Sequence, residues 1–189
     1  MGKNTIVKDA IILFAITLIS GLCLGFVYNM TKAPIEAAQE KAKQEAYQKV
    51  FADAASFQEN EEIKTALASY TADGAEVTEV LEAVDGSGAV IGHVVAVTAK
   101  EGYGGDISIT MGIDLAGTIT GFEVLSMSET AGLGAKCTND DFKGQFAGIQ
   151  APAEMVMNQD FDQISGATIT SKAITKALNA SVKFVSEVR

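Results

Sequence analysis

The sequence predicts an α+β protein, in which a single N-terminal transmembrane helix precedes a domain with an antiparallel sheet and flanking helices. Three observations support this fold class. An uncharged apolar run lies near the N-terminus, strand-like segments with alternating polarity fill the middle, and an amphipathic helical pattern ends the chain. The 189 residues, 48% of them hydrophobic, suffice for one ordinary domain with an appendage.

The apolar run "AIILFAITLISGLCLGFVYNM", residues 10–30, predicts the transmembrane helix. As an α-helix it would be about 31 Å long, close to the hydrocarbon thickness of a bilayer. Lys3 and Lys8 precede it, which favours a cytoplasmic segment 1–9 and an extracytoplasmic body at the cell membrane. A cleaved signal peptide is the alternative. The run is long for one and lacks a small-residue cleavage site, so a retained single-pass anchor in contact with lipid is favoured.

Residues 31–75 are expected to form a linking helical region. Pro34 suits the first position of a helix, and apolar residues then recur at helical spacing. These residues are Ile35, Ala38, Ala42, Ala46 and Val50.

Residues 76–189 are expected to form the main domain. "VTEVLEAV", "AVIGHVVAVT", "DISITMGID" and "TITGFEVLSMS" read as successive strands, separated by turn signals such as "DGSG". In the third segment Ile107, Ile109, Met111 and Ile113 share one side, which predicts a meander with one buried face. A closing helix is expected from Lys172 onward, with Ile174, Ala177, Leu178, Val182 and Val185 on its apolar side.

The charge distribution argues against a nucleic-acid partner. The net charge is −10, and residues 1–32, with three lysines and one aspartate, carry +2, which leaves −12 for the remainder. Nucleic-acid binding requires a basic surface. Cys23, Cys137 and the single histidine, His93, are too few and too scattered to predict a disulfide framework or a metal site.

Side-chain hydroxyls crowd the segment "DQISGATITSKAITKAL", residues 162–178. They belong to Ser165, Thr168, Thr170, Ser171 and Thr175. The amino end of a helix attracts phosphate through free N–H groups and a partial positive charge. Helix capping by Thr170 or Ser171 is the simpler explanation for one hydroxyl. The surplus favours a phosphate site, but leaves the ligand and any covalent bond open.

Two glycine-rich segments accompany the hydroxyl cluster. "EGYGGD" presents Tyr103 between glycines, and "SETAGLGAK" presents Leu133 between Gly132 and Gly134. Each alone is typical of an ordinary loop, and neither fits the dinucleotide-binding pattern G-x-G-x-x-G.

In combination these segments resemble a known family. "SGATITS" is similar to the S-G-A-T-x-T motif of proteins that carry FMN covalently, and "GYGGDISITMGIDLAGTITGFEVLSMSETAGLG" resembles the preceding part of the same FMN-binding domain. The resemblance covers roughly residues 89–185. It is strongest to G subunits of Rnf complexes, the membrane-bound ferredoxin:NAD oxidoreductases, and extends to C subunits of sodium-translocating NADH:quinone oxidoreductases.

The resemblance implies a set of site residues but no catalytic side chain and no metal ligand. Thr170 would be joined to FMN through a phosphodiester, and the phosphate site would be shaped by Ser165, Gly166, Ala167, Thr168 and Ser171. Candidates for further cofactor contacts are Tyr103, Glu129, Thr130, Gly132, Leu133, Gly134 and Lys136. The family has proline where Ala131 stands here, which implies a less restrained loop.

The implied function is electron transfer by a redox subunit of a multi-subunit, ion-translocating oxidoreductase. Ferredoxin oxidation and NAD reduction would be coupled to sodium or proton export. The partners would be membrane and iron–sulfur subunits, and a flavin transferase that uses FAD would attach the cofactor. The alternatives are a C-type quinone reductase subunit, another extracytoplasmic flavin carrier, or a membrane-anchored interaction module without redox activity.

Overall fold

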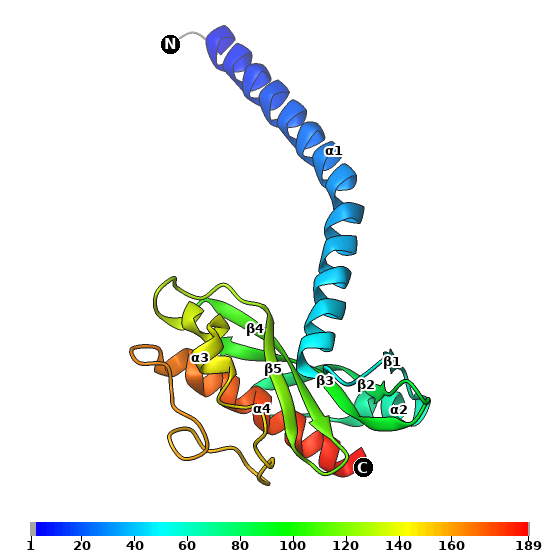
Figure 1. Cartoon of the computed structure of the whole chain (residues 1–189). Helices are drawn as coiled ribbons and strands as arrows, with labels where there is room; N and C mark the ends of the chain where they lie inside the picture. The colour runs from blue at the N-terminus through cyan, green and yellow to red at the C-terminus, as the bar shows by residue number, and fades with distance from the viewer. Residues whose placement is uncertain (1–2, 189) are drawn as a thin grey trace. The chain divides into compact units, whose positions relative to one another are not determined.

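The computed structural model of the chain describes residues 3–188 and divides into two compact units, one up to Ala42 and one from Lys43 onward (Figure 1). The helices are α1 (Lys3–Val50), α2 (Glu61–Ser69), the 3-10 helix η1 (Gly134–Thr138), α3 (Asp140–Lys143) and α4 (Thr168–Val188). The strands are β1 (Ser56–Gln58), β2 (Ala75–Val84), β3 (Val90–Gly102), β4 (Gly105–Asp114) and β5 (Ile119–Ser126).

The N-terminal apolar run lies within α1. Among the described residues, α1 is the one helix whose length and composition suit a membrane span, and the side chains of its apolar segment are exposed. The expectation that Pro34 begins a separate helix is wrong, because α1 continues through it. Proline removes one backbone hydrogen bond but need not end a long helix.

The second unit is built on a five-stranded antiparallel sheet in the order β1-β2-β3-β4-β5. Each strand pairs with its neighbour in sequence, as in the predicted meander. The region 31–75, expected to be a helical link, also contains β1 and α2. Asn60 caps α2 by accepting a hydrogen bond from the N–H of Glu62 at 2.8 Å.

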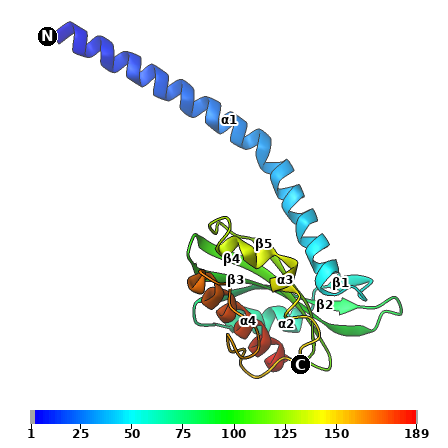
Figure 2. The same cartoon turned by 60° about the vertical axis from the view of Figure 1, so that its left-hand side comes forward.

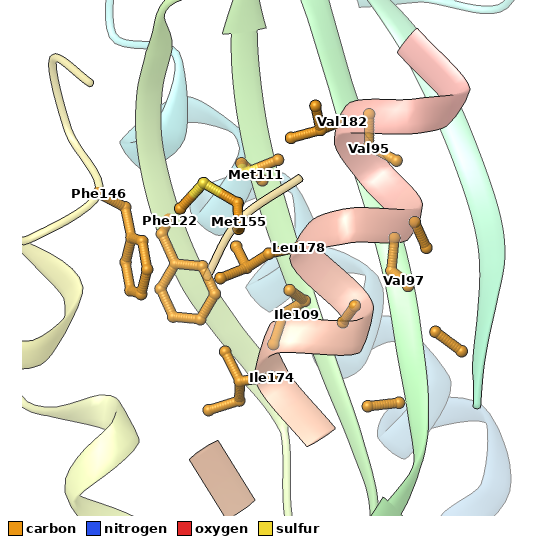
Figure 3. Close-up of a cluster of buried hydrophobic side chains, with 14 of the residues drawn as sticks. Val95, Val97, Ile109, Met111, Phe122, Phe146, Met155, Ile174, Leu178 and Val182 are labelled. Carbon is orange, nitrogen blue, oxygen red and sulfur yellow. The ribbon is translucent and has the colours of Figure 1, made fainter. Parts of the chain in front are cut away.

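Helix α4 covers one face of the sheet and contacts β2, β3 and β4 (Figures 1 and 2). Figure 3 shows Ile174, Leu178 and Val182 of α4 directed at apolar side chains of the strands. The predicted apolar side of β4 lies in this cluster, with Ile107, Ile109, Met111 and Ile113 all buried.

The prediction of a single buried face is incomplete, because the end of α1 and the residues after it pack on the other face. The second apolar cluster contains Tyr47, Val50, Phe51, Ala54, Leu81, Ala83, Val94 and Ala96. A Cβ atom on Gly121 would lie only 2.7 Å from Cα of Val50. Glycine in β5 therefore permits the backbone of the α1 terminus to approach the sheet closely.

Candidate functional site

A cavity of about 450 Å³ lies where three segments of the second unit meet. The segments are the β3–β4 hairpin, the loop after β5, and the turn that leads into α4. Its lining residues are Tyr103, Glu129, Thr130, Leu133, Gly134, Gly166, Ala167, Thr168, Ile169 and Thr170. The cavity therefore brings both glycine-rich loops together with Thr168 and Thr170 of the hydroxyl cluster.

Exposed apolar side chains surround this cavity. Outside α1, the large hydrophobic side chains that the described structure exposes are those of Tyr103, Leu115, Leu133, Val156 and Ile169. Tyr103, Leu133 and Ile169 all line the cavity, with exposed fractions of 70%, 45% and 51%. Apolar groups gathered at a concave surface indicate a binding site for a ligand with an apolar part.

The amino terminus of α4 supplies the polar side of the cavity. The helix begins at Thr168, four residues before the predicted start at Lys172, so Thr170 and Ser171 lie in its first turn. Capping of the helix by Thr170 or Ser171 is therefore wrong, because both residues lie inside the helix. The left-handed backbone of Gly166, with φ of +78°, sets the bend from which the helix starts.

The two adjacent hydroxyls, Thr170 and Ser171, have different partners. The Ser171 hydroxyl accepts a hydrogen bond from the N–H of Ile164 at 2.9 Å and donates one to the carbonyl of Ala167 at 3.0 Å. It therefore stabilises the turn before α4. Thr170 lines the cavity, although it is only 1% exposed, and its hydroxyl donates a hydrogen bond to Oε2 of Glu129 at 2.8 Å.

Nine of the residues that the sequence predicts for the cofactor site line the cavity. Ser165, Gly132, Lys136 and Ser171 do not line it, although they lie close by in sequence. Ile169 lines the cavity and was not nominated. The sequence shows only that Ile169 is an apolar residue between two threonines. Its exposure at the cavity is visible only in the folded structure.

The buried thiol of Cys137 contributes no nucleophile to this site at neutral pH. Burial, reinforced by the negative charge of Glu129, raises the pKa of the thiol to about 11. Across the described residues, no group of three or more histidine, cysteine, aspartate or glutamate side chains is placed to hold a metal ion.

A larger cavity, of about 570 Å³, lies between the chain around residues 70–73, the segment 154–157 and the exposed side of α4. Lys172, Lys176 and Lys183 line it, but so do Asp73 and Glu154, and Lys176 is paired with Asp73 at 3.4 Å. None of the nominated residues lines it. The larger of the two cavities is therefore not the one lined by the residues that the sequence predicts for the site.

Comparison with known proteins identifies the family of this chain. Residues 102–183 match the family described as FMN-binding domain, and residues 1–50 match the RnfG N-terminal region. The chain is similar to the G subunit of an ion-translocating oxidoreductase complex from Methanosarcina acetivorans, at 34% identity over 97% of this chain and 96% of the relative.

Two further proteins are similar to this chain. The G subunit of the Na(+)-translocating ferredoxin:NAD(+) oxidoreductase complex of Acetobacterium woodii is 30% identical over 95% of this chain and 91% of its own length. The crystal structure of Shewanella oneidensis NqrC superimposes with a TM-score of 0.49 at 23% identity, over 58% of this chain and 59% of that one. The full-length similarity to G subunits is decisive: the chain belongs to the family of G subunits of ion-translocating oxidoreductase complexes and contains that family's FMN-binding domain.

Proposed function

We propose that this chain carries FMN in a phosphodiester bond to Thr170 and transfers electrons within an Rnf-type complex. The observation that carries the proposal is the position of Thr170, which lines a cavity that combines an apolar rim with the amino end of α4. FMN has matching parts, because its ring is flat and largely apolar and its phosphate is an anion.

The residues present fit such a group. The first N–H groups of α4 have no partner within the helix and suit a phosphate, as does the helix dipole. Tyr103, Leu133 and Ile169 offer apolar contact to the ring. The bound flavin would supply the redox chemistry, while the protein holds it and sets its surroundings.

A covalent bond serves a carrier that works outside the cytoplasm. A flavin that dissociated from an extracytoplasmic domain would be diluted irreversibly, whereas a phosphodiester keeps it in place. The bond would be made by a separate flavin transferase with FAD as the donor, so Thr170 is an attachment point and takes no part in the redox reaction.

Membership in the family of G subunits supports a proposal for the partners. The relative in Acetobacterium woodii is named as part of a ferredoxin:NAD(+) oxidoreductase that translocates sodium ions. In the corresponding complex, this subunit would pass electrons between neighbouring centres, including iron–sulfur subunits, as ferredoxin oxidation and NAD reduction drive the export of sodium ions or protons.

Substitution of Thr170 tests the attachment. The wild-type chain, expressed with its transferase, should give a flavin-fluorescent band on a denaturing gel. Thr170→Val should give a dark band, and the complex that contains it should lose electron transfer from ferredoxin to NAD. Thr175→Val is the matched control, because this threonine lies five residues further along α4 and its hydroxyl bonds the carbonyl of Ser171 at 2.8 Å. A dark wild-type band, or a fluorescent Thr170→Val band, would contradict the proposal.

The orientation in the membrane is the second testable part. Lys3 and Lys8 favour a cytoplasmic N-terminus, with residues after the anchor on the opposite side. Alkaline phosphatase fused after the C-terminal residue should then be active, because it folds only outside the cytoplasm, and green fluorescent protein at the same position should be dark. The reverse pair of signals would place the flavin domain in the cytoplasm.

A further inference from the structure

Glu129 lies in the loop after β5, and its carboxylate bonds both α4 and the β3–β4 hairpin. Its Oε2 atom accepts the hydrogen bond from the Thr170 hydroxyl at 2.8 Å, and its Oε1 atom accepts one from the N–H of Gly104 at 3.1 Å. The hydrogen bond to Glu129 orients the Thr170 O–H bond. The hydrogen bond from Gly104, at the tip of the β3–β4 hairpin, holds the carboxylate of Glu129 in position.

The neighbouring glycines leave just enough room for this pair. A Cβ atom on Gly134 would lie 2.4 Å from Oε2 of Glu129 and 2.6 Å from Oγ1 of Thr170. One on Gly102 would lie 2.8 Å from Oε1 of Glu129. Thr170 itself is only 1% exposed. The hydroxyl and the carboxylate are thus held together in a confined space, where few other arrangements fit.

A threonine hydroxyl is a weak nucleophile until a base takes its proton. A general base must lie within hydrogen-bond reach of that proton, and Oε2 of Glu129 meets this requirement. An acceptor for the proton is therefore present in this chain itself, whatever groups the transferase contributes.

We infer that Glu129 accepts the proton of Thr170 when FMN is attached. This inference rests on the proposed attachment at Thr170. In the step, Oγ1 of Thr170 forms a bond to the phosphorus of the FMN half of FAD, the bond between the two phosphates breaks, and AMP leaves. The hydroxyl proton passes to the carboxylate of Glu129. No electrons are gained or lost.

The transfer also resolves a conflict of charges. Before attachment, the Thr170 hydroxyl is a donor to the carboxylate, whereas afterwards the same oxygen belongs to an anionic phosphodiester. Two negative groups at this separation repel each other, and the repulsion is screened only in part because the pair is partly buried. A carboxyl group that has received the proton is neutral and is itself a donor, so it tolerates the new neighbour.

The test measures the rate of flavin attachment in a single turnover, with the purified full chain in detergent, excess transferase and FAD. Attachment is followed by gel fluorescence and by intact mass. Glu129→Gln keeps the size of the side chain but removes the base, and should slow attachment by about 10²-fold. The control is Glu61→Gln, whose side chain is 88% exposed, and it should react at the wild-type rate.

A rescue experiment separates proton acceptance from packing. Glu129→Ala should react slowly and should be accelerated by formate, which can enter the vacated space and act as a base. An equal acceleration by chloride would assign the effect to filling that space and would overturn the inference. So would a wild-type rate for Glu129→Gln. By contrast, labelling of Thr170→Val would overturn the proposed attachment site.

If Glu129→Gln does not fold, Gly134→Ala provides the second variant. Its Cβ atom would force the carboxylate and the hydroxyl apart without changing either group. It should therefore slow attachment while Gly86→Ala, which adds a methyl group where no atom lies within 4 Å, leaves the rate unchanged. Equal rates for the two variants would overturn the inference.

Discussion

The two faces of the sheet are covered in opposite ways. Large side chains from α4, such as Leu178, fill the space over one face. On the other face, the end of α1 packs against positions that have no side chain. Two of them, Gly112 and Gly121, are paired across β4 and β5. Packing on the α4 face therefore depends on the volume of side chains such as Leu178, whereas the α1 face combines an apolar cluster with glycines that let the backbone at Val50 come close to the sheet.

Removing volume from the α4 face should have the largest effect. Leu178 is fully buried between α4 and the sheet, so Leu178→Ala should lower the free energy of unfolding by about 2–5 kcal/mol, through lost burial and a residual cavity. Denaturant titration of the full chain in detergent, followed by near-ultraviolet circular dichroism of its tyrosines, would measure the change.

The control for that substitution is Leu115→Ala, because Leu115 is 47% exposed. It should change the free energy of unfolding by a fraction of the Leu178 effect. Similar losses for the two leucines would show that the buried volume of Leu178 does not stabilise the α4 face.

Adding volume to the α1 face should have the next largest effect. The new Cβ atom in Gly121→Ala would lie 2.7 Å from Cα of Val50, and backbone atoms cannot move aside as a flexible side chain can. Overpacking of this kind should cost about 1–3 kcal/mol. The same denaturant titration applies.

Gly86→Ala should have the smallest effect, since no atom lies within 4 Å of the added methyl group. It therefore reports what the loss of a glycine does when no close approach is involved. If Gly121→Ala were as well tolerated as Gly86→Ala, the contact between Val50 and β5 would not contribute to stability.

Much of the fold follows from local pattern. The alternation in β4 determines which side of the strand carries Ile107, Ile109 and Met111, because side chains of a strand point to opposite faces in turn. The helical spacing of Ile174, Leu178 and Val182 likewise determines the apolar side of α4. Both patterns are properties of neighbouring residues, so the sequence alone contains them.

The covering of the second face was not predictable in the same way. The apolar spacing of Ala46 and Val50 showed that this helical segment has an apolar side, but not what that side contacts. The glycines in β4 and β5 are not part of an apolar pattern in the sequence. Their role becomes visible only when the segment that packs against them is known. That contact joins residues about 70 positions apart, as the hydrogen bond from Thr120 to the carbonyl of Val50 also does.

For the candidate site, too, some features follow from the sequence and others only from the tertiary structure. The sequence by itself determined the hydroxyl cluster, the two glycine-rich loops and, through their resemblance to a family, the prediction of FMN at Thr170. Only the tertiary structure showed the partners of the two adjacent hydroxyls: that of Thr170 bonds the carboxylate of Glu129, and that of Ser171 bonds the turn before α4. The reason is physical: a motif specifies which groups are present, whereas the partner of each hydroxyl depends on segments folded next to it, here 41 residues apart in sequence.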